Sequence, residues 1–484
     1  MQLYDICPQA KEQGVPDCPV RSVTDDTRSL EKGDIFVCIK GNSFDGHSAA
    51  AEMLEKGAAA VISERDLGLE RQVIVSDTRK QYALLAAAYH GNPEKKLKMI
   101  AVTGTNGKTT TAHLIQFILQ DSGKKCACIG TAGYDVCGKI YEADGDIPTT
   151  PRQMRLFSLL SEAVENGAEY CSIEASSQAL LQSRLYGIRF DVGIFTNLTQ
   201  DHLDVHGTME NYYKAKKLLF DSCDKALICT DDKYGRRLAQ ELTIPKKTYS
   251  ITDAGDYYSV NIKCAPSYVS YWFSSSADEK SFPIKFGMPG MFNVANSIAA
   301  AAACCELGLK VNGCAEALQR FGGVRGRCEV IYDGDFTVIC DYAHTPDALE
   351  KILTSVKDFV RGRIICVFGA AGERDADKRP DMGVIVGKNS DLAVLTSDNP
   401  RFEDPMQIIE QVEKGLDKTM ALYRSIENRR EAIEYALSQA QAGDVVLLCG
   451  KGHETHQVYG NDYQHFDEHE IVKEIMSGNR GGTE

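Results

Sequence analysis

Short apolar runs alternate along the chain with stretches in which apolar residues recur every three or four positions. IFVCI at 35–39 and AAVIS at 59–63 have the length and β-branched content of buried strands. The residues between them have helical spacing. A second helix is predicted to begin after Asp77, a suitable N-cap, and to end before Gly91. We therefore expect residues 1–97 to form a small α/β domain.

The same alternation continues through the rest of the chain. MIAVTG at 99–104 predicts a strand, and residues 108–122 predict a helix with Leu114 and Ile118 in its apolar stripe. Residues 256–286 are richer in Tyr, Val, Ser and Phe and predict an antiparallel insertion. The other candidates for buried strands are CSIEA at 171–175, DVGIFTN at 191–197, RIICVFG at 363–369, DLAVLTS at 391–397 and DVVLLCG at 444–450.

Strands that alternate with helices favour mostly parallel sheets covered by helices on both faces. We predict an α/β fold of three domains, with a central domain at 98–328 and a Rossmann-like α/β domain at 329–484 after the N-terminal one. The length of 484 residues agrees with this number at about 150 residues per domain.

Composition excludes several classes of protein. The formal net charge of −14 disfavours general nucleic-acid binding, because such a surface repels phosphate backbones. The N-terminus lacks the pattern of a signal peptide, and the longest small-apolar run, at 297–305, is too short to cross a membrane. Seventeen cysteines are scattered without a C-x-x-C pair, which favours reduced, buried thiols over metal ligands. We expect a cytosolic protein without a membrane anchor.

The segment MIAVTGTNGKTTTAHLIQ places a glycine-rich turn between a strand and a helix. Backbone N–H groups of such a turn and of the helix N-terminus form a concave array of donors for phosphate oxygens. Lys108 would reach the β- and γ-phosphates, and the Thr109 hydroxyl would bind Mg²⁺. The strict P-loop pattern is broken because Val102 stands where its first glycine belongs. The alternative is an ordinary strand-to-helix turn; we predict a P-loop-type domain that binds ATP and Mg²⁺.

Nine short motifs, in order along the chain, resemble those of the Mur ligases, which form amide bonds in peptidoglycan precursor synthesis. Each motif alone is modest, but together they are highly specific. They are GTNGKTT at 104–110, TTP at 149–151, EASS at 174–177, NLTQDHLD at 197–204, AK at 215–216, NVAN at 293–296, GR at 326–327 with Glu329, DYAH at 341–344 and GKGHE at 450–454.

The resemblance implies a domain for the UDP substrate, an ATPase domain and an amino-acid-binding domain, in that order. It also implies that a carboxylate is phosphorylated by ATP to an acyl phosphate, which an amine then attacks. Glu174 and His202 would bind Mg²⁺ with Thr109, and Lys216 would be a carbamylated metal ligand. For His202 the alternative is a structural histidine, and for Lys216 a solvated basic helix face. The implied ATP-binding residues are Gly104, Thr105, Asn106, Gly107, Lys108, Thr109, Thr110, Asn293 (also a candidate N-cap), Arg327 and Asp341, with help from His344.

The motif DNPR at 398–401 resembles the one with which family members recognise meso-diaminopimelate. Arg401 could grip the second carboxylate of that amino acid, and Asp398 and Glu454 could accept from its ammonium group. Lysine lacks this carboxylate and would leave Arg401 unpaired, at a cost in binding. Arg374 would bind the other carboxylate. The full implied set is Arg374, Asp398, Asn399, Pro400, Arg401, Gly450 and Glu454.

The co-substrate implied by the resemblance is UDP-N-acetylmuramoyl-L-alanyl-D-glutamate. DDTR at 25–28 and GNSFDGH at 41–47 resemble UDP-binding loops, although plain turns are the alternative reading. Gln178 stands where relatives commonly have His. The residues that match positions for this substrate are Asp25, Thr27, Asn42, Ser43, Phe44, Thr149, Thr150, Ser176, Gln182 and Arg184.

Other functions stay open at this point. A lysine-adding relative is the main alternative within the ligases, and folylpolyglutamate synthetase has a similar phosphate loop but neither the DNPR motif nor the UDP-type loops. A P-loop kinase would transfer phosphate without an amine, and a nucleotide-binding regulatory module would release none. We expect a monomer that acts on two small substrates.

Overall fold

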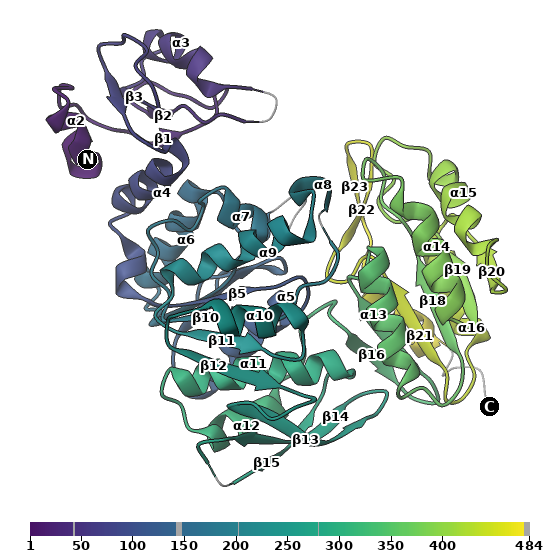
Figure 1. Cartoon of the computed structure of the whole chain (residues 1–484). Coiled ribbons are helices and arrows are strands. Elements are labelled where there is room, and N and C mark those ends of the chain that lie inside the picture. Colours follow the sequence, from purple (N-terminus) through teal and green to yellow (C-terminus); the bar gives the residue numbers. More distant parts are fainter. Residues whose placement is uncertain (42–43, 142–147, 202, 279, 479–484) are drawn as a thin grey trace.

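The computed structural model describes residues 1–41, 44–141, 148–201, 203–278 and 280–478. Figure 1 shows a small N-terminal unit, a large central unit and a C-terminal unit that faces the central one. Each unit is built on its own sheet, so the predicted α/β class with three domains is confirmed. Among the described residues, no helix is both long and apolar enough to cross a bilayer.

The N-terminal unit is a four-stranded parallel sheet in the order β1-β2-β3-β4. Its longest helix, α4, begins after Asp77 as predicted, and the Asp77 carboxylate accepts a hydrogen bond from the Lys80 backbone N–H at 3.0 Å. The predicted strands at 35–39 and 59–63 are β2 and β3. The elements are α1 (Leu3–Ile6), α2 (Pro8–Glu12), β1 (Val23–Thr24), β2 (Ile35–Val37), η1 (Gly46–Ala49), α3 (Ala50–Glu55), β3 (Ala60–Ser63), β4 (Gln72–Ile74), α4 (Thr78–Tyr89) and η2 (Pro93–Lys96).

The central unit is an eleven-stranded sheet in the order β15-β14-β13-β12-β11-β10-β5-β9-β6-β7-β8. Its middle strands are parallel, and both edges are antiparallel. The strands are β5 (Lys98–Thr103), β6 (Cys126–Gly130), β7 (Gly133–Asp135), β8 (Ile140–Tyr141), β9 (Tyr170–Glu174), β10 (Val192–Phe195), β11 (Ala226–Cys229), β12 (Lys246–Ser250), β13 (Tyr257–Cys264), β14 (Val269–Ser275) and β15 (Phe282–Phe286).

The segment 256–286 is antiparallel, as predicted, in strands β13 to β15. It is not a separate insertion, because β13 pairs in parallel with β12 and so extends the main sheet. The helices of the central unit are α5 (Lys108–Asp121), α6 (Gln153–Glu165), α7 (Ser177–Leu181), α8 (Leu203–His206), α9 (Met209–Lys217), η3 (Leu218–Ser222), α10 (Lys233–Glu241), α11 (Met291–Glu306) and α12 (Val311–Arg320).

The C-terminal unit has a six-stranded sheet in the order β16-β17-β21-β18-β19-β20, parallel except for β16, and a separate hairpin of β22 and β23. Helices α13 to α15 cover one face, and α16 and α17 cover the other. The elements are β16 (Glu329–Asp333), β17 (Thr337–Asp341), α13 (Pro346–Lys357), β18 (Ile364–Phe368), α14 (Lys378–Asn389), β19 (Leu392–Leu395), α15 (Pro405–Leu416), β20 (Leu422–Ser425), α16 (Arg429–Gln439), β21 (Val445–Cys449), β22 (His456–Tyr459), β23 (Asp462–His465) and α17 (Glu468–Gly478).

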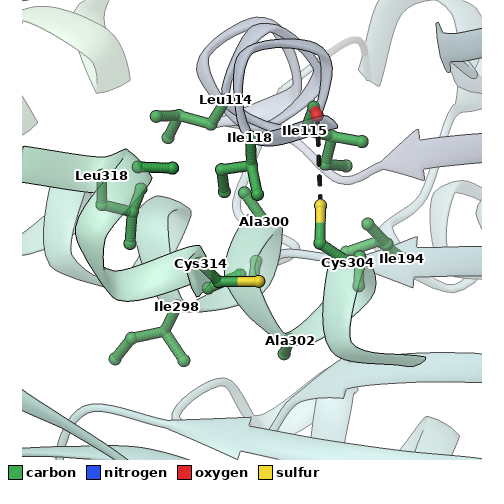
Figure 2. Close-up of a cluster of buried hydrophobic side chains, with 14 of the residues drawn as sticks. Leu114, Ile115, Ile118, Ile194, Ile298, Ala300, Ala302, Cys304, Cys314 and Leu318 are labelled. Atoms are coloured by element: carbon green, nitrogen blue, oxygen red, sulfur yellow. Dashed lines mark hydrogen bonds between the residues drawn. The ribbon is translucent and has the colours of Figure 1, made fainter. Parts of the chain in front are cut away.

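The core under the central sheet is formed where α5 crosses α11 (Figure 2). Ile118 of α5 packs near Ala300 of α11, whose alanine run lets the two helices approach closely. The Cys304 thiol in the same helix lies 4.0 Å from the Ile115 carbonyl oxygen and donates to it. All seventeen cysteines are free thiols, which confirms the prediction of a reduced protein core.

Replacing Ile118 by Ala should lower the free energy of unfolding by about 2–5 kcal/mol, because the side chain is fully buried and its removal leaves a cavity. Denaturant titration followed by far-ultraviolet circular dichroism measures this loss. Ile140, in strand β8 of the central sheet and 65% exposed, gives the control: Ile140→Ala should cost less than about 0.5 kcal/mol. Equal losses in the two variants would contradict the packing of α5 on α11.

Candidate active site

The glycine-rich turn connects β5 to α5, as the sequence predicts. Gly104 and Gly107 have φ values of 150° and 84°, and both are hemmed in by neighbouring side chains. A Cβ atom on Gly104 would lie 1.9 Å from the Thr196 hydroxyl oxygen, and one on Gly107 would lie 2.2 Å from Oδ1 of Asn296. The turn therefore requires glycine at both positions, and its backbone is left open toward a ligand.

Hydrogen bonds from β10 and the loop after it fix the shape of this turn. The Thr196 hydroxyl donates to the Asn106 carbonyl oxygen at 2.7 Å, and the Asn106 backbone N–H donates to Oδ1 of Asn197 at 3.1 Å. The Thr105 backbone N–H donates to the Asn197 carbonyl oxygen at 2.9 Å. The turn is thus preorganised by Thr196 and by Asn197, the first residue of the NLTQDHLD motif.

Two ammonium groups meet at this turn. Lys108 donates to the carbonyl oxygens of Gly104 and Thr105 at 3.1 and 2.9 Å, and Lys216 donates to the same Gly104 oxygen at 2.7 Å. Lys216 is fully buried, whereas Lys217 is turned outward to pair with Glu241, so Lys216 is not part of a solvated basic face. Burial lowers the pKa of Lys216 well below that of a free lysine, and Lys108 lowers it further.

Burial also lowers the pKa of Lys108, while the negative charge of Glu174 opposes the fall. Glu174 is the last residue of β9 and is fully buried. Its Oε1 accepts from the Thr131 backbone N–H at 2.7 Å, and Oε2 accepts from the Thr131 hydroxyl at 3.2 Å. These bonds hold the Glu174 carboxylate close to Lys108 and the glycine-rich turn. Thr131 was not singled out by the sequence, because it belongs to no motif.

Asn293 lies inside helix α11 and is not its N-cap, so that prediction was wrong. The helix begins one turn earlier, after Gly290 at φ 96°, and Asn293 donates to the Pro289 carbonyl oxygen at 2.8 Å. Its Oδ1 accepts from Asn296 at 3.2 Å. Asn293 thereby orients Asn296, which presses against Gly107.

The junction between the central and C-terminal units supplies the opposite wall. Arg327 lies over the ring of Tyr342, with 4.8 Å between the guanidinium carbon and the ring centroid. The Asp341 carboxylate accepts from the backbone N–H groups of Cys328 and Ala343 at 2.7 and 2.8 Å, and burial raises its pKa. Asp341 is thus engaged in shaping the junction, and His344 follows it with Nδ1 2.7 Å from the Tyr342 carbonyl oxygen.

One cavity of about 960 Å³ lies between the two units. The central unit contributes the turn, Glu174 and α11, and the C-terminal unit contributes a further set of side chains. These are Asp341, Tyr342, His344, Lys351 and Arg374, with Arg327 at the junction of the two units. The size suits a nucleotide together with a second ligand.

The DNPR loop follows β19, next to this cavity but outside its lining. Its backbone is tied to the GERD loop at 372–375, because the Gly372 N–H donates to the Asn399 carbonyl oxygen at 2.9 Å. Arg401 is half-buried, and its φ of 55° is unusual for a residue other than glycine. Glu373 in the second loop has a φ of 54°. Asp398 and Asn399 are buried, and a Cβ on Gly450 would lie 2.5 Å from Oδ2 of Asp398.

Residues expected to hold the UDP substrate lie in both the N-terminal and the central unit, and an ion pair joins the two units near them. Arg184 donates to the Thr150 carbonyl oxygen at 2.6 Å and to Oε1 of Gln182, and Ser176 caps α7. Asp25 lies 3.9 Å from Arg152, which joins the two units. The Phe44 side chain is 51% exposed, and Thr27 is partly exposed. Thr149 lines the cavity between the central and C-terminal units. The predictions for Asn42, Ser43 and His202 lie outside the described residues.

A polar bridge that no sequence motif indicates joins α13 to the glycine-rich turn. The Asp347 carboxylate accepts from Lys351 at 2.6 Å, from the Thr199 hydroxyl at 3.2 Å and from Asn106 at 3.3 Å. Lys351 also donates to the Thr199 hydroxyl at 2.8 Å. The only sequence signal is the helical spacing of Asp347 and Lys351, which is common on solvated helices.

A glycine-rich turn at the start of a helix, set across a cavity from a Rossmann-like domain, is the arrangement expected of a nucleotide-dependent enzyme. Family models match on all three units: the Mur ligase family catalytic domain at residues 19–96, the Mur ligase middle domain at 102–304, and the Mur ligase, glutamate ligase domain at 326–452. The chain belongs to the Mur ligase family, and it is an ATP-dependent ligase.

Curated relatives cover nearly the whole chain. One from Clostridium acetobutylicum, named UDP-N-acetylmuramoyl-L-alanyl-D-glutamate--2,6-diaminopimelate ligase 1, is 41% identical over 93% of each chain. A ligase of the same name, without the numeral, from Caldanaerobacter subterraneus subsp. tengcongensis is 40% identical over 99% of each chain.

Solved structures give the same fold. A UDP-N-acetylmuramoyl-L-alanyl-D-glutamate--2,6-diaminopimelate ligase aligns with a TM-score of 0.69 and 33% identity over 96% of each chain. The folylpolyglutamate synthase of Mycobacterium tuberculosis aligns with a TM-score of 0.61 over 84% of this chain and 96% of its own, but at 14% identity it shares the fold alone.

Replacing Lys351 by Ala should lower the turnover number about 10-fold, because the Asp347 carboxylate would then face the phosphate-binding turn without its counter-charge. Steady-state phosphate release measures the effect. Lys357→Ala, at the far end of the same helix, is the matched control, since Lys357 bonds only to Asn389 and the Lys388 backbone among the described residues. Equal turnover in the two variants would show that the bridge has no catalytic consequence.

Proposed function

We propose that the chain adds meso-diaminopimelate to the D-glutamate γ-carboxylate of UDP-N-acetylmuramoyl-L-alanyl-D-glutamate, in peptidoglycan precursor synthesis. The observation that carries the proposal is the DNPR loop at the carboxyl end of β19, beside a cavity that also contains the phosphate-binding turn. The names of relatives that are 38–41% identical over most of the chain support it.

The proposed reaction has two steps. A carboxylate oxygen of D-glutamate attacks the γ-phosphorus of ATP, and ADP leaves; the amine then attacks the acyl carbon, loses a proton, and phosphate leaves. Backbone N–H groups from Gly104 to Thr110 hold the phosphates, and Lys108 neutralises charge that develops on them. Asn296 holds the turn in place, while Asn293, Arg327 and Asp341 shape the remaining walls of the nucleotide site.

Mg²⁺ is the proposed metal, and the oxygen donors of the site fit it. Magnesium takes one or two carboxylates, hydroxyl groups and substrate phosphates, and needs no dedicated cage. Among the described residues no group of three His, Cys, Asp or Glu side chains could hold a metal alone, which agrees with ligation shared with phosphate. Glu174 and Thr109 would hold the ion, which supplies positive charge for the crowded anions. His202 is proposed as a further ligand from its motif.

Lys216 is proposed to be carbamylated. Only a neutral amine attacks CO₂, and burial beside Lys108 favours the neutral form of Lys216. Attack of the Nζ lone pair on carbon, with loss of one proton, gives a carbamate. The change would turn a repelled cation into an anion that bonds well next to Lys108.

The amino-acid site is proposed to lie between the DNPR, GERD and GKGHE loops. Arg401 would bind the distal carboxylate, Arg374 the proximal one, and Asp398 and Glu454 the distal ammonium group. Asn399 and Pro400 set the loop, and Gly450 leaves room for Asp398. The UDP substrate would be held by Asp25, Thr27, Asn42, Ser43, Phe44, Thr149, Thr150, Ser176, Gln182 and Arg184.

Domain limits at 97/98 and 328/329 are part of the proposal, supported by matched family ranges that end at 96 and 304 and resume at 102 and 326.

We also propose a monomer, since every assigned role falls on one chain. The cytoplasm is the proposed compartment, in keeping with ATP as co-substrate and with free thiols throughout.

Phosphate release should require the UDP-muramoyl dipeptide together with meso-diaminopimelate. L-lysine should give less than about 1% of that kcat/KM, because it lacks the carboxylate that Arg401 is proposed to bind. Lys108→Met should abolish turnover with either amine and serves as the inactive control. Equal activity with lysine would reassign the amino acid. ADP formed without any amine and without free phosphate would favour a kinase, and no ADP at all would favour a binding module.

Lys216→Ala should lose turnover at least about 10³-fold and regain part of it when a short carboxylic acid such as acetate or formate is added, because the acid replaces the carbamate oxygens. Lys217→Ala, which changes the adjacent exposed lysine, should keep turnover within about two-fold. Failure of every short acid to restore Lys216→Ala would count against carbamylation.

A further inference from the structure

Lys451, in the GKGHE segment after β21, has no assigned role, yet its side chain is completely buried. Its ammonium group donates to Oε2 of Glu454 at 2.7 Å and to Oδ1 of Asn399 at 2.8 Å. A buried lysine is costly unless its charge is paired and its hydrogens are bonded. Lys451 therefore links the two loops that carry the proposed amino-acid ligands.

Asn399 belongs to the same network of hydrogen bonds. Its Oδ1 also accepts from the Val458 backbone N–H at 3.1 Å, and its Nδ2 donates to Oε2 of Glu454 at 2.9 Å. One oxygen of Glu454 thus receives two donors. Oε1 enters none of the hydrogen bonds found among the described residues, and the Glu454 side chain is 18% exposed. The network fixes one oxygen of Glu454 and presents the other.

The charge of Glu454 depends on this arrangement. Burial alone would raise its pKa, but the Lys451 ammonium group, the hydrogen bonds from Lys451 and Asn399, and the charge of His456 together outweigh burial, so the pKa is lowered. With Lys451 in place, Glu454 is a carboxylate over the whole physiological range. Without Lys451, burial would dominate and favour the neutral acid.

We propose that Lys451 is a positioning residue, through which Glu454 recognises the second ammonium group of the amino acid. Lys451 does not touch the substrate; it keeps Glu454 ionised and aims its Oε1 at the ligand. Arg401 would bind the neighbouring carboxylate. The carboxylate and the ammonium group of the second amino-acid centre would therefore be recognised by separate side chains. This inference rests on the proposed function, since it requires an amino acid with two ammonium groups.

The test compares meso-diaminopimelate with 2-aminopimelate, which keeps the attacking amine and both carboxylates but lacks the second ammonium group. The intact enzyme should prefer meso-diaminopimelate by about 10- to 100-fold in kcat/KM, the range expected for a hydrogen bond between charged groups. Lys451→Met, of similar length and without charge, should reduce this preference to within about three-fold, with the KM for ATP unchanged.

A purely structural role for Lys451 would slow both amines equally and keep their ratio, and that result would overturn the inference. Lys414→Met, which removes an exposed lysine of α15, is the matched control and should keep the ratio of the intact enzyme. Glu454→Gln should lose the preference as well, and adding Lys451→Met to it should change little more. If Lys451→Met does not fold, an undiminished preference in Glu454→Gln alone overturns the inference.

The pH dependence gives a second readout. In Lys451→Met the KM for meso-diaminopimelate should rise as the pH falls from about 8 to about 6, because the raised pKa of Glu454 lets it take up a proton. In the intact enzyme the lowered pKa keeps Glu454 ionised, so that KM should stay flat. If the intact enzyme does not use meso-diaminopimelate at all, the proposed function fails; if it does and the variant matches it, only the role of Lys451 fails.

Discussion

Two ammonium groups converge on one carbonyl oxygen, that of Gly104, at 3.1 Å from Lys108 and 2.7 Å from Lys216. Like charges this close in a buried site repel, and each lowers the tendency of the other to stay protonated. This repulsion is relieved when anions occupy the site during the reaction. Glycine at 104 and 107, the hydrogen bond from Thr196 just after β10 and the helix N-terminus of α5 all serve to receive those anions.

The C-terminal unit treats buried charge differently, because its cations are paired within the protein. Arg379 bonds to Glu403 at 2.8 Å, Arg429 to Glu468 at 2.7 Å, and Lys451 to Glu454 at 2.7 Å. All three cations are almost fully buried and lie under or beside the DNPR and GKGHE loops. Arg429 also donates to the Cys449 carbonyl oxygen at 2.8 Å, which supports the start of the second loop. Rigid supports of this kind suit a site that must discriminate between similar amino acids.

Much of the fold could be predicted from the sequence because its signals are local. Apolar runs located β5, β9, β18, β19 and β21, and Asp77 located the start of α4. Local signals also misled: NVAN suggested an N-cap at Asn293, but Gly290, with its positive φ, starts α11 earlier. The joining of β13 to β12 was missed because strand order depends on contacts between distant segments.

The candidate site, too, could be predicted only in part from the sequence. Motifs identified the turn, Glu174, Lys216 and the DNPR loop, since those residues carry recognisable chemistry at fixed spacing. Thr131, Asp347 and Lys451 escaped notice because their importance lies in what they touch across the fold. Nothing in their own neighbourhood distinguishes Asp347 and Lys351 from an ordinary helical ion pair.

The shared cavity has a consequence for inhibitor design. Because its walls come from two units, a compound that contacts only the phosphate-binding turn gains nothing from the wall that the C-terminal unit supplies. A scaffold that spans from the turn to Arg374 would restrain both walls at once and gain from each contact the effective concentration set by the other. Selectivity over kinases would then follow from geometry, since that second wall belongs to this ligase architecture.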